Sequence, residues 1–291
     1  MIDFEYAAAA TLDEAVTLLA ARGERAKILA GGTDILVQLR EGQREADLVV
    51  DVKRIPELTE VRHSARDGLR LGGAAPCYKL YEDAEIATAY AALADAARII
   101  GGWQIQTRAS VGGNLCNSSP AADSIPPLIV YNATCHIVGP DGTRDVPAAE
   151  FCTAPGRNAL KRGELLAWID LPPQPAHSGA HYLRFIPRNE MDIAVVGCGA
   201  WLEFDPNSDK IRAARIALAA VAPTPVLAEE AATWLVGREA SDATFAQAGE
   251  LARKVATPIS DMRGPAEYRT HLVGVLAKRA LCKAAERAKQ R

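Results

Sequence analysis

The chain has 291 residues, is 49% hydrophobic and carries a formal net charge of −3 at pH 7. This length can bury a large core and suggests two or three domains. Lysines and arginines are scattered, which argues against a nucleic-acid-binding surface, and no apolar stretch reaches the ~20 residues of a membrane span. The N-terminus lacks a basic region followed by an apolar one, so we expect no signal peptide and a cytoplasmic protein.

The first 57 residues predict a small βαβ-like unit. The expected elements are a helix at 11–22, a strand at 26–30, a helix at 34–42 and a strand at 47–52. Thr11, with a glutamate three residues later, predicts the cap of the first helix. Thr33 or Asp34 is expected to cap the second. A Gly-Gly pair therefore lies at a strand-to-helix junction.

The middle of the chain mixes hairpins with helices. The expected elements are a hairpin at 58–75 that turns at Arg66-Asp67-Gly68, helical structure at 78–101, a helix and a second hairpin within 126–152, and a strand at 164–172. The proline-rich stretch 172–179 is the best candidate for a linker.

Residues after this stretch predict strands followed by helices. The expected strands are 181–187, 192–204 and 210–221, and the expected helices are 226–237, 242–256 and 267–291. Gly197-Cys198-Gly199 begins like a dinucleotide-binding fingerprint. The third glycine is missing, so we interpret it as a buried strand that packs closely.

Two glycine-rich stretches, KILAGGTD (27–34) and SVGGNLCNSSPAADSIPP (110–127), suggest two backbone cradles that converge on one diphosphate. For the first stretch alone, an ordinary tight turn with a helix cap is the favoured explanation, because Gly-Gly pairs are common in turns. The second offers hydroxyl and amide donors and one acid, Asp123, so a binding loop is favoured over a plain loop. We expect Gly113 to allow close backbone approach and a positive φ.

Other common site patterns are missing from the sequence. The six cysteines form no CxxC pair, the five histidines share no metal-like spacing, and neither GK[ST] nor HExxH occurs. We therefore predict no metal site and name no catalytic residue in this chain. Between Arg184 and Asp192 two basic and two acidic residues precede an apolar strand. They form either a solvated turn or a loop that opposes a bound cofactor.

Five segments, in the same order as in the family, resemble the FAD-binding medium subunit of molybdenum hydroxylases, which includes the flavin domain of xanthine dehydrogenase and the medium subunit of carbon monoxide dehydrogenase. They are KILAGGTDIL, TRASVGGNLCNSSPAADSIPPLI, RNEMDIAVVG, IRAARIALAAVAPTPVLAEEA and ISDMRGPAEYRTHLVGVLAKRAL. The resemblance covers about residues 2–284. It implies an α+β protein with the vanillyl-alcohol-oxidase (PCMH) type of FAD-binding fold. Two α/β FAD-binding subdomains (1–57 and 58–175) would precede a C-terminal α+β domain (178–291) with a three-stranded sheet, covering the flavin.

The resemblance also implies which residues bind one non-covalent FAD. The first cradle would comprise Lys27, Ile28, Leu29, Ala30, Gly31, Gly32, Thr33, Asp34 and Ile35, and the second Ser110, Gly112, Gly113, Asn114, Cys116 and Asn117. Asp123 would hold the ribose or adenosine part, Ile100 and Gly101 would line the pocket, and Leu165 and Leu166 would pack near the adenine–ribitol side. Arg184 takes the place of a lysine near the flavin ring.

The implied function is that of an electron-transfer subunit in a heterotrimeric enzyme. A large partner would carry the molybdenum cofactor and a small partner two [2Fe–2S] clusters, with a dimer of heterotrimers as the assembly. FAD would pass electrons from the clusters to NAD, oxygen, a quinone or another carrier. One alternative is a stand-alone FAD oxidoreductase of the same fold, which would need its own acid or base. Another alternative is a scaffold subunit that has lost flavin. Both glycine turns are intact, which argues against this alternative.

Overall fold

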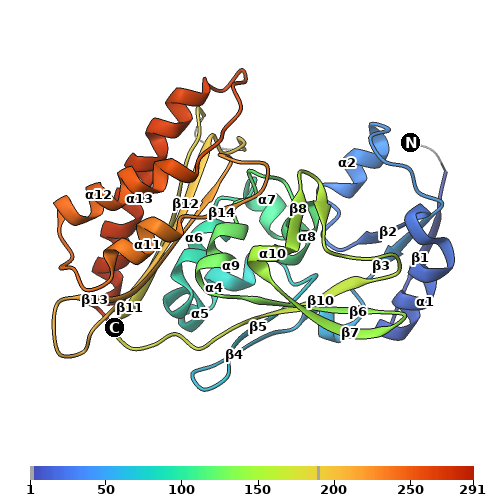
Figure 1. Ribbon diagram of the computed structural model, residues 1–291. Helices are drawn as coiled ribbons and strands as arrows, with labels where there is room; N and C mark the ends of the chain where they lie inside the picture. Colours follow the sequence, from blue (N-terminus) through green and yellow to red (C-terminus); the bar gives the residue numbers. More distant parts are fainter. Residues whose placement is uncertain (1–2, 189–190) are drawn as a thin grey trace.

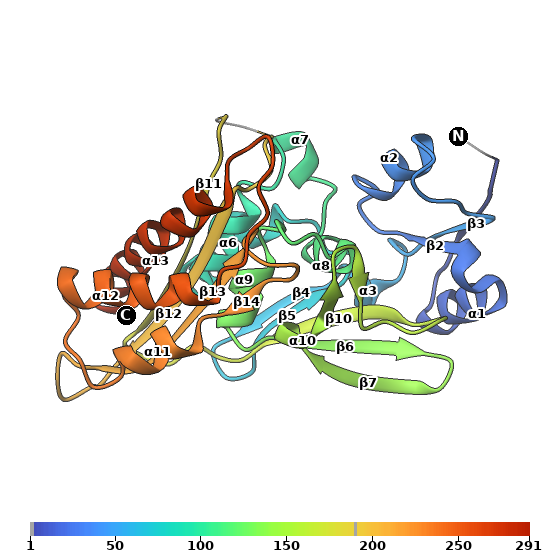
Figure 2. The same cartoon turned by 45° about the horizontal axis from the view of Figure 1, so that its top comes forward.

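The computed structural model describes residues 3–188 and 191–291. Three β-sheets follow one another along the chain, and helices cover them (Figure 1). The N-terminal unit and the C-terminal helices lie at opposite ends of the molecule in both views (Figure 1, Figure 2). Within the described residues, no helix combines the length and the apolar character needed to cross a bilayer.

The N-terminal sheet is parallel, with strand order β1-β3-β2. Its elements are β1 (Glu5–Ala8), α1 (Leu12–Arg22), η1 (Gly23–Arg25), β2 (Ala26–Leu29), α2 (Ile35–Arg40) and β3 (Leu48–Asp51). The predicted α1 and its cap are confirmed, because the Thr11 hydroxyl accepts from the N–H of Glu14 at 3.2 Å. The predicted cap of α2 is wrong: Asp34 occupies the N-cap position, but no side-chain hydrogen bond caps the helix.

The middle sheet is antiparallel, with strand order β4-β5-β10-β6-β7. Its strands are β4 (Val61–Ser64), β5 (Gly68–Gly72), β6 (Thr134–Gly139), β7 (Gly142–Pro147) and β10 (Leu165–Leu171), and β8 (Cys152–Ala154) pairs separately with β9 (Arg157–Asn158). Its helices are α3 (Pro56–Thr59), α4 (Lys79–Glu82), α5 (Ala84–Ala89), α6 (Ala91–Ala97), α7 (Trp103–Gln106), α8 (Val111–Asn117), α9 (Ile125–Val130) and α10 (Ala148–Phe151). Both predicted hairpins are confirmed.

The C-terminal sheet is antiparallel, with order β11-β12-β13-β14. Its elements are β11 (Ser178–Phe185), β12 (Val196–Phe204), β13 (Ile211–Ala219), β14 (Val226–Leu227), α11 (Glu229–Leu235), α12 (Asp242–Ala252), η2 (Arg253–Val255) and α13 (Ala266–Ala288). The expected three strands are present, and the fourth, β14, has only two residues after a proline-rich turn. Helices α11–α13 cover one face of the sheet, while α6 and α9 of the middle region pack on the other (Figure 2).

Strand β10 lies between two hydrophobic cores. Leu166 and Ile169 belong to the core that the middle sheet shares with Tyr182 and Trp201 of the C-terminal sheet. Its residues Leu165 and Ala167 belong instead to the core of the N-terminal unit. A single strand therefore ties the three sheets together, and the functional site lies where they meet.

Candidate functional site

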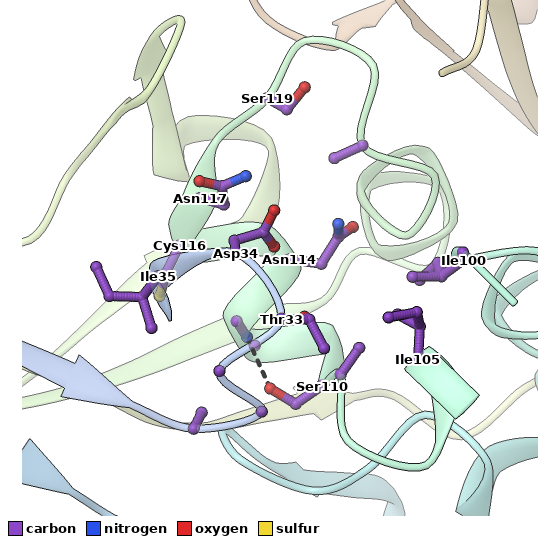
Figure 3. A pocket seen from close by; sticks show the side chains of 18 of the residues that line it. Thr33, Asp34, Ile35, Ile100, Ile105, Ser110, Asn114, Cys116, Asn117 and Ser119 are labelled. Carbon is purple, nitrogen blue, oxygen red and sulfur yellow. Dashed lines mark hydrogen bonds between the residues drawn. The ribbon is translucent and has the colours of Figure 1, made fainter. Parts of the chain in front are cut away.

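A cavity of about 550 Å³ lies between the N-terminal unit, helix α8, strand β10 and the start of the C-terminal sheet (Figure 3). Both glycine-rich stretches face it, although about 80 residues separate them in the sequence. Its size falls in the usual range for small-molecule sites. All the predicted cofactor-binding residues except Leu29 line it: Lys27, Ile28, Ala30, Gly31, Gly32, Thr33, Asp34, Ile35, Ile100, Gly101, Ser110, Gly112, Gly113, Asn114, Cys116, Asn117, Asp123, Leu165, Leu166 and Arg184.

Leu29 does not line the cavity. Its side chain packs instead with Phe4 and Ile35 against the small core formed by Leu39, Ala46 and Val49.

The first glycine loop approaches the second stretch backbone to backbone. A Cβ atom on Gly31 would lie 2.3 Å from the carbonyl oxygen of Arg108, so no other residue fits there without a shift. Gly32 adopts φ +82°, which explains the second glycine of the pair. Among the residues that the structure describes, the backbone N–H groups of positions 31–34 find no hydrogen-bond acceptor. Four consecutive free amides beside a cavity form a ready site for an anion.

The second stretch is helical, not the loop that we expected. Its residues 111–117 form α8, and the Ser110 hydroxyl accepts from the N–H of Gly113 at 3.0 Å and donates to the carbonyl oxygen of Gly73 at 2.9 Å. A Cβ on Gly112 would lie 2.3 Å from that same oxygen. The expected positive φ at Gly113 is wrong, because Gly113 lies in the first turn of the helix. A Cβ there would meet only the Ser110 hydroxyl, at 3.0 Å.

A buried polar cluster closes another part of the cavity. The Asp123 carboxylate, 7% exposed, accepts from the Tyr182 hydroxyl at 2.7 Å and pairs with the Arg184 guanidinium. Burial raises the pKa of Asp123 to about 6, and Arg184 and Tyr182 oppose this shift. Arg184 is thus held at the cavity wall by an acid from the turn between α8 and α9.

Few reactive groups face the cavity. Burial raises the pKa of the Cys116 thiol to about 12, so this thiol is protonated and a poor nucleophile at neutral pH. Among the residues that the structure describes, no group of three or more His, Cys, Asp or Glu side chains is placed to hold a metal ion. The cavity suits the binding of a long ligand with an anionic part.

The sequence missed the remaining wall residues. They are Gln38, Arg44, Val52, Leu58, Gly73, Ala74, Ile105, Ala109, Ala121, Ala122, Leu160, Ile193 and Ala194. Most are ordinary apolar or small residues with no signal of their own. Gly73 had one, because Gly72-Gly73 is another glycine pair, at the end of strand β5. The loop from Arg184 to Asp192 does reach the cavity through Met191 and Asp192, while Asn189 and Glu190 lie outside the described residues.

Two family descriptions match the chain. The FAD binding domain in molybdopterin dehydrogenase matches residues 2–174, and the CO dehydrogenase flavoprotein C-terminal domain matches residues 181–284. The chain is 35% identical to the putative xanthine dehydrogenase FAD-binding subunit of Escherichia coli (strain K12), over 98% of this chain and 97% of that one. It is 30% identical to the carbon monoxide dehydrogenase medium chain of Hydrogenophaga pseudoflava, over 96% of each.

Solved structures give the same result. The reconstituted CO dehydrogenase from Oligotropha carboxidovorans matches with a TM-score of 0.93 and 31% identity, over 99% of this chain and 100% of that one. Quinoline 2-oxidoreductase from Pseudomonas putida 86 matches with a TM-score of 0.91 and 28% identity, over 99% of this chain and 98% of that one.

Proposed function

Because the chain belongs to the family of FAD-binding subunits of xanthine and carbon monoxide dehydrogenase-type molybdenum hydroxylases, we propose that it is the electron relay of such an enzyme. The family and the α+β fold class expected from the sequence are thereby confirmed. The chain is an oxidoreductase flavoprotein subunit. The relay function and the site assignments below are our proposals.

We place FAD in the cavity between the two glycine-rich stretches. The observation that carries this assignment is the run of free amides at positions 31–34, which line the same cavity as Gly112 and Gly113. A diphosphate supplies the acceptors that these amides lack. At Gly31 and Gly112 a Cβ would collide with the backbone of Arg108 and of Gly73, so these glycines let the segments that border the cavity pack closely together. When bound, FAD supplies the redox chemistry, taking up and releasing one or two electrons.

The chain's own residues bind and orient the cofactor. The apolar side chains of Ile100, Ile105, Leu165 and Leu166 exclude water from part of the cavity. Arg184, fixed by Asp123, presents a cation with further N–H donors at the wall. No side chain has to act as an acid or a base, because the substrate reacts on another chain.

The proposed assembly has three kinds of chain. Relatives are named as a medium chain or as one subunit of a dehydrogenase complex, which supports partners of other types. A large partner would hold the molybdenum cofactor and a small one two [2Fe–2S] clusters, arranged as a dimer of heterotrimers. FAD would pass their electrons to NAD, oxygen, a quinone or another carrier. Ranges 1–57 and 58–175 would bind FAD, and 178–291 would cover it.

Reconstitution tests the relay. The purified chain should bind one FAD, which acid precipitation should leave in a yellow supernatant, because no covalent anchor is expected. Alone it should oxidise no aldehyde, aromatic heterocycle or carbon monoxide. Adding the large and small partners should restore flavin reduction by the substrate of the molybdenum site. Turnover by the isolated chain would refute the relay and favour a stand-alone oxidoreductase, while a chain that binds no FAD would favour a scaffold.

A further inference from the structure

We propose that Asp95 is a positioning residue for the FAD cavity. It lies outside the cavity and fixes strand β11 against the middle region, which places Arg184 at the cavity wall. This inference rests on the proposed FAD site. Asp95 lies on α6, in the middle region, and does not line the cavity. Arg184 lies on β11, in the C-terminal sheet, and does line it. The position of one region against the other therefore sets the position of Arg184.

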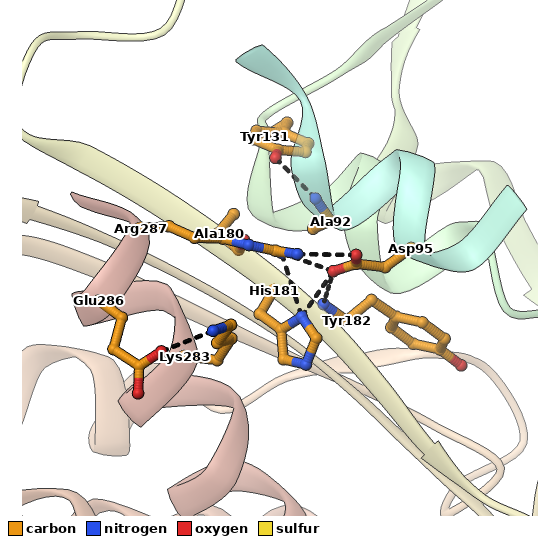
Figure 4. Close-up of polar contacts among 9 residues, drawn as sticks. All are labelled: Ala92, Asp95, Tyr131, Ala180, His181, Tyr182, Lys283, Glu286 and Arg287. Carbon is orange, nitrogen blue, oxygen red and sulfur yellow. Dashed lines mark hydrogen bonds and ion pairs between the residues drawn. The ribbon is translucent and has the colours of Figure 1, made fainter. Parts of the chain in front are cut away.

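Asp95 joins three elements (Figure 4). Its two carboxylate oxygens accept from the Arg287 guanidinium of α13, at 2.6 and 2.9 Å. The same carboxylate lies 2.5 Å from Nδ1 of His181 and accepts from the backbone N–H of Tyr182 at 3.2 Å, both on β11. Arg287 also donates to the carbonyl oxygen of Ala180, at 2.8 Å. A single carboxylate thus fixes both the strand and the helix that covers it.

The charge of the Asp95 carboxylate depends on its hydrogen-bond partners, because the carboxylate is largely buried. Burial by itself would raise the pKa of Asp95, but the hydrogen bonds from Arg287 and His181 outweigh it and hold the pKa below its usual value. The carboxylate is therefore charged at neutral pH and bound from both sides. A two-pronged guanidinium contact fixes direction as well as distance.

Tyr182 connects this contact to the cavity. Its backbone N–H donates to Asp95, and its hydroxyl donates to Asp123, the acid that holds Arg184. Tyr182 and Arg184 are two residues apart, so their side chains leave the strand on the same face. Strand β11 is thus tied to the middle region by two carboxylates, Asp95 at residues 181–182 and Asp123 at Tyr182 and Arg184.

The apolar contacts of this interface cannot fix the position of β11 in the same way. Tyr182 and Trp201 pack into the shared core. Burial of apolar area is non-directional, so it favours contact without fixing how far the sheet slides along α6. The Asp95 contacts are directional and select one placement.

A double-mutant cycle on FAD affinity tests the inference. Asp95→Asn removes the charge while keeping the size of the side chain, and we expect the Kd for FAD of the apo chain to rise about tenfold. Arg184→Ala should also raise this Kd. In the Arg184→Ala background, Asp95→Asn should change the Kd by less than about twofold, because Asp95 acts through Arg184. Fluorescence titration of the full-length apo chain with FAD provides each Kd.

Controls separate positioning from general destabilisation. Glu286→Gln breaks an exposed pair with Lys283 on the same helix and should leave the Kd unchanged. If Asp95→Asn does not fold, Arg287→Gln removes the contact from the other side and takes its place in the cycle. The inference would be overturned if either Asp95→Asn or Arg184→Ala bound FAD as tightly as wild type. It would also be overturned if the effects of the two substitutions on the free energy of FAD binding were additive. Failure of the wild type to bind FAD would instead overturn the proposed function.

Discussion

Single glycines around the cavity have different functions although they are neighbours in sequence. Gly112 faces the backbone of Gly73, whereas Gly113 faces the cavity. The fold therefore requires the first glycine, and the proposed ligand requires the second.

This difference gives a paired prediction. Gly113→Ala should fold with a free energy of unfolding within about 1 kcal/mol of wild type, since its Cβ meets only the Ser110 hydroxyl, and should weaken FAD binding at least tenfold. Gly112→Ala should lose about 1–3 kcal/mol of stability, because its Cβ collides with the Gly73 carbonyl oxygen. Urea denaturation and FAD titration measure the two effects. The assignment of the second cradle fails if Gly113→Ala retains full affinity.

Asp123 makes the stability of the apo chain depend on pH. Its pKa is raised from 3.8 to about 6, chiefly by burial, so between these values the folded protein binds a proton that the unfolded chain does not. Its contribution to stability is therefore fully present below pH 3.8 and is lost as the pH rises through 6. A shift of about two pKa units corresponds to about 3 kcal/mol.

Asp123→Asn removes this titration. From pH 4 to pH 7, the free energy of unfolding should fall by about 2 kcal/mol more in wild type than in the variant. Asp242→Asn is the control, because Lys278 holds the pKa of this exposed acid below its usual value and it titrates below pH 4. Urea denaturation at several pH values gives both curves, and parallel curves for wild type and Asp123→Asn would contradict the prediction.

Among the elements, helix α8 was not predicted from the sequence. Glycine has a low helix propensity, so the sequence VGGN predicts a turn and not a helix. Tertiary contacts decide the outcome: the Ser110 hydroxyl caps the helix, and Gly112 lets it pack on the backbone of Gly73. Strand β1 was missed for another reason, because four residues that include two alanines show no alternation.

Other elements were predictable because their signals are local. The cap at Thr11 and the turn at Arg66-Asp67-Gly68 involve residues within three or four positions of one another, and both are confirmed. The cavity depends on contacts across the sequence, so the residues near the glycine motifs were found through the family resemblance. Arg44, Ile105 and Leu160 were not, since nothing in their local sequence marks them.

Ser110 should matter more to stability than an ordinary helix cap. Ser110→Ala removes both the cap of α8 and a buried hydrogen bond to Gly73, so we expect a loss of about 2 kcal/mol in the free energy of unfolding. Thr11→Ala removes only the exposed cap of α1 and should cost about 1 kcal/mol or less. Equal losses in urea denaturation would show that the contact with Gly73 adds nothing.

For the whole molecule, the shared hydrophobic cores should determine which parts unfold together, more than the division into residues 1–57, 58–175 and 178–291. Strand β10 contributes to two cores, and residues of the C-terminal sheet complete one of them. We therefore expect the middle and C-terminal regions to unfold together. Urea transitions followed by far-UV circular dichroism and by tryptophan fluorescence should coincide. A chain that ends at residue 175 should not fold, because its truncation uncovers the core; two separate transitions, or a folded truncated chain, would contradict this.

The contact between Gly31 and Arg108 also constrains how the sequence can evolve. The atoms nearest to a Cβ at position 31 are backbone atoms of residues 108 and 109, so the side chain at 108 is not among them. Mutations at 108 should therefore drift almost freely among descendants of this chain, while any change at 31 should be eliminated by selection. The two positions touch, yet they should show no covariation in an alignment of relatives. A method that infers contacts from correlated substitutions would thus overlook the point where the two halves of the cavity meet.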